Sequence, residues 1–565
     1  MDIKQNIIAA IGKIIDIPEP ELADWLEIPP TPDMGDFAFP CFKLAKSMRK
    51  APAVIASELC VALPKISGIS EAKNVGPYLN FFIDKALFSK NALSRVLSCG
   101  TSYGSSNEGN GKTICIDYSS INIAKPFSIH HLTTTVLGHS LKRIFDHLGY
   151  TTVSINHLGD WGTQFGKMLV AFRKWGDKET IENGASMREL VKLYVRFHEE
   201  AENDPGLNDQ AREAFRQIEL HDPESWELFE WFKEVTLKDV NKVYELLGIK
   251  FDSYAGEAFY EDKMQAVIDE LEDKNLLTID NGCSIVDLSE YDMPPCLILK
   301  SNGGTVYPTR DITAAIYRKN TYDFHKNLYV VAYQQNLHFQ QFFKVLELMG
   351  YEWAKDCVHV NFGMISMADG TLSTRKGKVV YLEDVLNAAV EKTLEIIKEK
   401  SPDLENKEYV ARQVGVGAVI FGVLYSGRIK DIVFSYEKAL NFDGETGPYV
   451  QYTHARCCSV MRKSMGYDAD NIDFSKLCDE SSIALLRSIE ALPDIINAAA
   501  DKYEPFLIAR AAVDICSKFN KFYYDNRIMD DDEATRNARL ALTDATRITI
   551  KVALSLIGLE APERM

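Results

Sequence analysis

The stretch TICIDYSSINIAKPFSIHHLTTTVLG, residues 113–138, decides the fold of this 565-residue chain. It begins with a short apolar run, Thr113–Tyr118, which is typical of a buried strand, and it leads into a helical pattern from about His131 to Leu148. A second strand-like run, Thr151–Asn156, follows. This order predicts a parallel sheet with right-handed crossovers, which binds ligands at the carboxyl ends of its strands. A ligand is therefore expected at the loop Ser119–His130.

A charged helical stretch near residues 175–247 interrupts the strand pattern, and we interpret it as an insertion. Its aromatic residues Trp226, Phe229 and Phe232 recur at three-residue spacing. They form either a stacking surface or the apolar face of a packed helix, and the packed helix is the simpler interpretation. Further strands are expected near Cys296–Leu299, Leu328–Tyr333 and Val358–Phe362.

The flanking sequence predicts one further domain on each side. Before the sheet come helical patterns around Ile3–Ile15 and Phe42–Leu63, a strand-like run Tyr78–Ile83, and a linker rich in Gly, Ser and Asn at residues 99–111. After it, the chain from Leu382 reads almost wholly as helices. The expected fold class is α/β, with a Rossmann-like parallel-sheet domain, a small α+β N-terminal domain and an all-helical C-terminal domain. We place these domains at residues 112–380, 1–105 and 381–565.

Composition and charge narrow the class of protein. Apolar residues make up 46% of the chain and charged residues 25%, as in soluble globular proteins. The 63 basic and 81 acidic residues give a net charge of −18, which by itself favours small-molecule substrates over nucleic acid. The 11 cysteines show no C-x-x-C spacing, which indicates reduced thiols and a cytoplasmic location.

No membrane role is expected from the sequence. The longest largely apolar stretch, Val414–Tyr425, is too short to span a bilayer. Met1 is followed by Asp2 rather than by a basic segment with a long apolar core, so no secretory signal is evident.

Two polar loops predict a site for phosphate groups. The first carries Lys125 just before the paired histidines His130 and His131, where amide groups at a helix N-terminus favour anionic oxygens. The second, DGTLSTRKGK at residues 369–378, is rich in basic and hydroxyl side chains. Taken alone it is a solvated charged loop, but between a predicted strand and a predicted helix it can close over the same phosphates. Together the loops make nucleotide binding the favoured interpretation.

The two loops resemble the signature motifs of class I aminoacyl-tRNA synthetases, and their residues resemble those of the arginyl-tRNA synthetases. Further strings of that family follow in the same order over nearly the whole chain. The supporting strings are SINIAKPFSIHHL from Ser120, INHLGDWGTQFGK from Ile155, YPTRD from Tyr307, QQNLHF from Gln334, LSTRKG from Leu372, GPYVQYTHAR from Gly447 and the C-terminal APERM.

The resemblance implies an enzyme that activates L-arginine with ATP to arginyl-adenylate and transfers it to tRNA(Arg). The Rossmann-like domain would be catalytic, Mg²⁺ would accompany ATP, and no protein-bound metal is predicted. Negative charge develops on the phosphates during activation, so the site needs positioned donors and cations rather than a nucleophile. The implied catalytic residues are Lys125, His131 and Arg375. The implied ATP contacts are Ser128, His130, Ser373, Thr374 and Lys376; Thr374 stands where the second motif usually has a lysine, and Lys125 would substitute for it.

A pocket for arginine should offer carboxylates and a flat aromatic face to the planar guanidinium group. Tyr307 and Asp311 are four residues apart and would share a helix face if a helix starts there. Asp311 by itself is equally typical of a helix N-cap or first turn. The resemblance assigns the guanidinium to Glu257, Tyr307 and Asp311, and the amino and carboxylate ends of arginine to Ser120, Asn122 and Gln335.

The tRNA would contact both flanking domains. Aromatic side chains that stack on unpaired bases are the usual means of holding a single-stranded loop. Such aromatics are Tyr449, Tyr452, His454 and Tyr523, whose alternative interpretation is a helix core with the polar group at its rim. By resemblance, Asn80 and Phe82 would contact the tRNA elbow, and the terminal Met565 would also lie at the tRNA. We expect the enzyme to be a monomer.

The first signature motif departs from the family, which has His-Ile-Gly-His or His-Val-Gly-His. Here Ser128 replaces the first histidine and His130 replaces the glycine against which the family places adenine. Ile121 and Thr133 also replace the usual proline and arginine. Two hypotheses follow: an active arginine-tRNA ligase with a divergent ATP site, or a weakened paralogue that binds tRNA or arginine.

Overall fold

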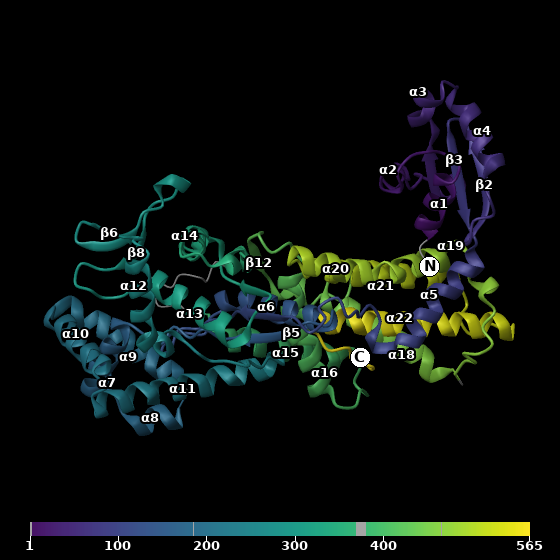
Figure 1. The fold of residues 1–565 in the computed structure, drawn as a ribbon. Coiled ribbons are helices and arrows are strands. Elements are labelled where there is room, and N and C mark those ends of the chain that lie inside the picture. The colour runs from purple at the N-terminus through teal and green to yellow at the C-terminus, as the bar shows by residue number, and fades with distance from the viewer. Residues whose placement is uncertain (1–2, 185, 369–379, 465) are drawn as a thin grey trace. The chain divides into compact units, whose positions relative to one another are not determined.

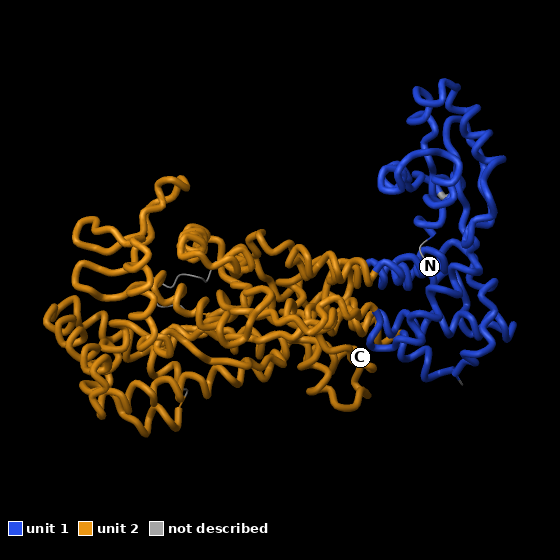
Figure 2. Tube along the Cα trace, viewed as in Figure 1, with its two compact units in different colours: residues 1–103, 457–491, 514–549 blue, residues 104–456, 492–513, 550–565 orange. Residues whose placement is uncertain are grey.

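The computed structural model describes residues 3–184, 186–368, 380–464 and 466–565, in two compact units (Figures 1 and 2). Unit 1 comprises residues 1–103, 457–491 and 514–549, and unit 2 comprises residues 104–456, 492–513 and 550–565. In the described ranges, no helix has both the length and the apolar character needed to cross a membrane.

The centre of unit 2 is a four-stranded parallel sheet in the order β10-β9-β4-β5. Its strands are β4 (Thr113–Asp117), β5 (Thr151–Ile155), β9 (Lys326–Tyr329) and β10 (Cys357–His359). Ile114, Cys115 and Ile116 of β4 are fully buried, because both faces of the sheet are covered. Helix α6 (His130–His147) makes the crossover from β4 to β5. The predicted Rossmann-like sheet is thus confirmed, and its carboxyl edge is where the site lies.

One face of this sheet packs on three helices in a continuous apolar core. These are α12 (Met264–Asp273), α13 (Tyr307–Tyr322) and α14 (Asn336–Leu348). Cys115 of β4 and Ile155 of β5 meet Ile312 of α13 and Phe342 of α14 in that core. The core therefore fixes the start of α13 against the end of the sheet.

The strand Cys296–Leu299 exists as β8, but its place in the sheet was predicted wrongly. It pairs antiparallel with β7 (Cys283–Val286), which pairs with β6 (Leu277–Asp280) in a separate sheet. The turn between β6 and β7 is Asn281–Gly282, with both residues at positive φ, and this dipeptide is a strong hairpin signal. A short apolar run gives a strand but does not say which sheet it joins.

The helical insertion is also present in unit 2. It contains the helices α7 (Thr163–Trp175), α8 (Lys178–Asn183), α9 (Ser186–Asn203), α10 (Gly206–Glu219) and α11 (Pro223–Leu247). Phe229 and Phe232 are fully buried, and the half-buried Trp226 lies 5.2 Å from the Phe229 ring. The aromatic spacing therefore marks the apolar face of a packed helix.

The N-terminal part of unit 1 is a small α+β fold with its own apolar core. Its elements are α1 (Ile3–Gly12), α2 (Glu19–Trp25), β1 (Phe37–Pro40), α3 (Ala45–Met48), α4 (Pro52–Ala62), β2 (Ile69–Val75) and β3 (Tyr78–Ile83), with the antiparallel sheet order β1-β3-β2. The helical pattern predicted over Phe42–Leu63 is not continuous. It breaks at Arg49, which has φ 51°, and α4 restarts with Pro52, since proline fits the first turn of a helix.

The rest of the chain is mostly helical, as predicted for the part from Leu382, whereas the helix Lys85–Cys99 was not predicted. Its helices are α5 (Lys85–Cys99), α15 (Leu382–Lys400), α16 (Lys407–Leu424), α17 (Tyr436–Ala439), α18 (Gly447–Lys463), α19 (Glu480–Glu490), α20 (Leu492–Lys502), α21 (Phe506–Asp525) and α22 (Glu533–Leu556). The strand β12 (Ile432–Phe434), which pairs with β11 (Ile365–Met367), is the departure from an all-helical C-terminal region.

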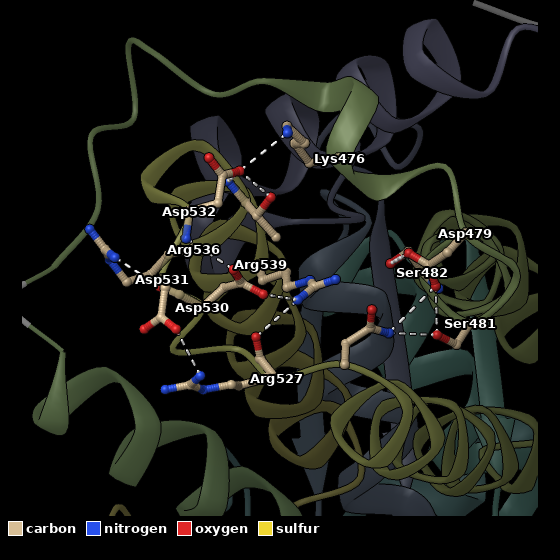
Figure 3. A network of polar contacts seen from close by, with 12 residues as sticks. Lys476, Asp479, Ser481, Ser482, Arg527, Asp530, Asp531, Asp532, Arg536 and Arg539 are labelled. Atoms are coloured by element: carbon tan, nitrogen blue, oxygen red, sulfur yellow. Dashed lines mark hydrogen bonds and ion pairs between the residues drawn. The ribbon is translucent and has the colours of Figure 1, made fainter.

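Aspartate caps and ion pairs fix the helices of unit 1 (Figure 3). Asp479 caps α19, accepting hydrogen bonds from Ser482 N at 3.0 Å and Ser481 Oγ at 2.7 Å. Asp532 accepts from Thr535 N at 3.0 Å at the start of α22 and pairs with Lys476 Nζ at 3.2 Å. These caps satisfy N–H groups that a helix start leaves without partners.

Candidate active site

A cavity of 490 Å³ opens at the carboxyl ends of β4 and β9 in unit 2. All six residues predicted to bind arginine line it, although they come from distant parts of the sequence. They are Ser120 and Asn122 from the loop after β4, Glu257 from the segment between α11 and α12, Tyr307 and Asp311 from the first five residues of α13, and Gln335 just before α14. The fold therefore brings together the residues that the sequence motifs predicted for arginine binding.

The N-terminal end of α13 presents one aromatic ring and one carboxylate to this cavity. The helix begins at Tyr307, so Tyr307 and Asp311 do lie one turn apart. Asp311 Oδ2 lies 2.6 Å from His338 Nε2. Burial would raise the pKa of Asp311, but the hydrogen bond and positive charge from His338 lower it below its ordinary value. Asp311 is thus held ionised in a half-buried position.

Glu257 supplies a second, half-buried carboxylate. Burial raises the pKa of Glu257 to about 7, against the opposing effect of the Arg310 guanidinium, whose NH1 lies 3.5 Å from Glu257 Oε2. The Arg310 guanidinium also lies 5.6 Å from the centre of the Tyr307 ring. Our sequence reasoning missed Arg310 and His338 as cavity residues. Both stand inside quoted motifs, YPTRD and QQNLHF, and that position was the available signal.

A buried ion pair lies behind the loop that follows β4. Arg318 of α13 is 1% exposed, and its NH2 donates to Asp117 Oδ2 at 2.7 Å. The other oxygen of Asp117 accepts from Ser120 Oγ at 2.6 Å. Gly159 packs on the same loop, where a Cβ atom would overlap Asn122 Oδ1. These contacts fix the direction in which Ser120 and Asn122 face the cavity.

The first signature motif lies at the start of α6. His131 Nδ1 lies 3.2 Å from Ser128 N and 3.3 Å from the carbonyl oxygen of Ser128, so the backbone of Ser128 fixes the orientation of the ring. Burial lowers the pKa of His131 to about 4, so His131 is a neutral donor near pH 7. The half-buried His130 has a buried Nδ1 with no hydrogen-bond partner among the described residues. Burial also lowers the pKa of Lys125, against the opposing charge of Glu257.

The second signature motif lies outside the part of the chain that the structure describes. Ser373, Thr374, Arg375 and Lys376, which were predicted to contact ATP or to act in catalysis, lie outside the described residues. For the predicted phosphate-binding part of the candidate site, the structure therefore describes the start of α6 and the loop before it.

The residues predicted to contact tRNA differ in exposure. Tyr452 is 41% exposed and Tyr523 44% exposed, and Tyr449 is half-buried. His454 is fully buried, with its Nδ1 2.9 Å from the Pro562 carbonyl oxygen, so a base can stack on it only after a rearrangement.

The remaining predicted tRNA contacts also divide by burial. Asn80 is 3% exposed, whereas the half-buried Phe82 lines a cavity of 800 Å³ in unit 1. Met565 packs against the apolar cluster of α15 and α16 in unit 2.

Comparisons with known proteins match the whole chain. Three family models match it: "Arginyl tRNA synthetase N terminal domain" at residues 1–83, "tRNA synthetases class I (R), catalytic domain" at residues 92–436, and "DALR anticodon binding domain" at residues 450–565. The chain is 52% identical to an arginine–tRNA ligase of Halothermothrix orenii, with 100% of both chains covered. It is 54% identical to that of Clostridioides difficile, with 98% of both covered.

Solved structures agree with these matches. The arginyl-tRNA synthetase of Thermus thermophilus superposes with a TM-score of 0.81 at 25% identity, covering 100% of this chain and 99% of that one. The arginyl-tRNA synthetase of Plasmodium falciparum shares the fold, with a TM-score of 0.80 at 22% identity and coverage of 100% and 98%.

Proposed function

This chain belongs to the arginyl-tRNA synthetase family, and we propose that its arginine–tRNA ligase reaction takes place in the cavity at the carboxyl ends of β4 and β9. One observation carries this proposal: the six residues expected to hold arginine line that single cavity. The alternative of a catalytically weakened paralogue is not favoured, because relatives about half identical over the full length are named arginine–tRNA ligases.

The guanidinium group of L-arginine is proposed to lie against Tyr307 and between two carboxylates. Glu257 and Asp311 would accept its fork of N–H donors, an arrangement that the single ammonium of lysine does not match. Ser120, Asn122 and Gln335 would hold the amino and carboxylate ends. The lining of the cavity and the buried ion pair behind Ser120 support this orientation.

Activation requires no protein nucleophile. A carboxylate oxygen of arginine attacks the α-phosphorus of ATP, the bond from that phosphorus to the oxygen bridging to the β-phosphorus breaks, and diphosphate leaves. Lys125 and the imidazole of His131 would stabilise the charge that develops on the phosphate oxygens, together with Arg375. A ribose hydroxyl of the tRNA terminus then attacks the carbonyl carbon of arginyl-adenylate, and AMP leaves.

The ATP site is proposed to include Ser128, His130, Ser373, Thr374 and Lys376. Mg²⁺ would enter with ATP on its phosphate oxygens, which is the usual arrangement for this ion. In the described part of the chain, no group of three or more His, Cys, Asp or Glu side chains is placed to hold a metal ion.

The tRNA is proposed to contact both flanking domains. Residues 1–105, with Asn80 and Phe82, would contact the tRNA elbow. The helical domain at 381–565 would contact the anticodon through Tyr449, Tyr452, His454, Tyr523 and the terminal Met565. The exposure of Tyr452 and Tyr523 supports their part of this proposal most directly. We also propose a monomeric enzyme located in the cytoplasm.

Arginine-dependent ATP–diphosphate exchange, measured with tRNA(Arg) present, tests the proposed site. Asp311→Ala should abolish the exchange, because it removes an ionised carboxylate from the guanidinium position, while ATP binding stays within about twofold. Asp403→Ala, on an exposed loop residue, is the matched control and should exchange like the wild type. Exchange by Asp311→Ala at the wild-type rate would refute the assignment of the cavity. Loss of ATP binding together with exchange would instead indicate misfolding.

A further inference from the structure

The loop that lines the arginine cavity has an unusual backbone. Ser119 and Ser120 are consecutive residues with φ of 70° and 43°, and Ala124 has φ 57°. Residues other than glycine rarely adopt this left-handed region, and they remain there only when their surroundings determine the conformation. The contacts that hold this loop are therefore part of what shapes the arginine site.

One buried contact of this loop comes from the helical insertion. The Tyr244 hydroxyl of α11 lies 2.7 Å from Ser119 Oγ, although the two residues are 125 positions apart in sequence. The same hydroxyl accepts a hydrogen bond from Asn156 Nδ2 at 2.8 Å, and Asn156 Oδ1 accepts from Ile121 N at 3.4 Å. The hydroxyl of Tyr244 thus joins two points of the loop, one on each side of Ser120.

The ring of Tyr244 reaches the nucleotide half of the site. It packs edge-on against Phe127 with ring centres 5.4 Å apart, and Phe127 lies 5.4 Å from the ring of His131. A second residue of α11, Thr236, accepts a hydrogen bond from Ala124 N at 3.3 Å. Helix α11 therefore contacts the loop at its start, middle and end.

We propose that Tyr244 is a positioning residue for the ligase reaction. Its hydroxyl sets the arginine-binding part of the loop through Ser119 and Asn156, and its ring sets His131 through Phe127. A tyrosine that merely fills the core would also need a hydrogen-bond partner. Its loss would destabilise the fold, but it would not change the KM for arginine more than the KM for ATP. The inference rests on the proposed role of the loop in binding arginine.

Two substitutions separate the two parts of this role. Tyr244→Phe keeps the ring but removes the two buried hydrogen bonds of the hydroxyl, so it should raise the KM for arginine by about tenfold or more, with the KM for ATP unchanged. Tyr244→Leu also removes the ring and should raise both KM values. Tyr254→Phe is the matched control, because its partly exposed hydroxyl bonds to Asn241 of the same helix at 3.3 Å and does not touch the loop.

A double-mutant cycle tests whether Tyr244 acts through Ser119. If it does, Ser119→Ala combined with Tyr244→Phe should raise the KM for arginine little more than either change alone. If the double mutant instead raises the KM for arginine by the product of the two single effects, the proposed route through Ser119 is wrong. A KM for arginine within twofold of the wild type in Tyr244→Phe, or equal changes in Tyr254→Phe, would overturn the positioning role. Absence of arginine-dependent exchange in the wild type would refute the proposed function itself.

Discussion

Glu257 is a half-buried carboxyl group whose charge state changes close to neutral pH. Burial raises its pKa to about 7, and the Arg310 guanidinium opposes that rise. The protonated form lacks the charge that would attract a guanidinium group. Because the unbound carboxyl is half protonated near pH 7, the capture of arginine should weaken as the pH falls through that value.

This gives a pH-dependence prediction for the free enzyme. We expect kcat/KM for arginine to fall as pH drops from about 8 to 6, since that ratio reports ionisations of the unbound enzyme. Glu257→Gln should lower kcat/KM at pH 8 by about tenfold or more and remove this pH step, because a neutral amide does not titrate. The exposed Glu272→Gln serves as control. A step of the same size and midpoint in Glu257→Gln would assign the titration to another group.

The residues of the site were predictable where a local motif contains them. Tyr307 and Asp311 share one turn of α13, so their spacing alone predicted a common face. Tyr244 belongs to no motif and reaches the site only through a tertiary contact with Ser119. Contacts of that kind depend on how distant elements pack, and a single sequence does not contain that information.

At the scale of elements, local patterns were sufficient for the sheet that carries the site. The apolar run of β4 and the amphipathic pattern of α6 specify one element each, and their bounds match the prediction to within one residue. Local patterns do not say which sheet a strand joins, as β8 shows. Its apolar pattern fits either sheet, and β8 pairs with β7 outside the parallel sheet. The helix predicted over Phe42–Leu63 failed because Arg49 leaves the helical conformation just before Pro52.

Helix α19 depends on its capping residue, Asp479. Burial would raise the pKa of Asp479, but hydrogen bonds from Ser482 and Ser481 lower it below its ordinary value. Asp479→Ala should destabilise α19 by about 1–2 kcal/mol, because the cap is lost and Ser481 and Asn526 lose a shared partner. Amide hydrogen exchange within α19 measures this local effect in a chain with two compact units.

The pH dependence of the same cap has a definite sign. A carboxyl whose pKa is lowered in the folded state stabilises that state at pH values above its unfolded pKa. This contribution is lost as the pH falls through the folded pKa. The difference between the wild type and Asp479→Ala should therefore be constant at neutral pH and shrink below about pH 4. Asp470→Ala, on an exposed residue, should leave exchange in α19 unchanged. Equal protection in all three proteins would show that packing alone holds the helix.

At the scale of the whole molecule, net charge bears on selectivity among nucleic acids. The chain has a net charge of −18, and the part from residue 441 to 565 has 15 basic and 20 acidic residues, a net charge of −5. Many of those basic residues are already paired. Arg527, Arg539 and Lys476 of unit 1 pair with Asp531, Asp530 and Asp532 (Figure 3). An acidic surface of this kind repels nucleic acid except where local cationic and aromatic groups are placed to meet it.

Binding of tRNA should therefore involve few phosphate contacts and a strong preference for the cognate molecule. With about two or three such contacts, raising salt from 50 to 200 mM should weaken tRNA(Arg) binding about 10- to 40-fold, since each contact releases less than one counterion. Filter binding at several KCl concentrations measures that slope, with a non-cognate tRNA as the matched control. A non-cognate tRNA that binds as tightly as tRNA(Arg) at 50 mM salt would contradict the argument, because general phosphate attraction would then dominate over local recognition.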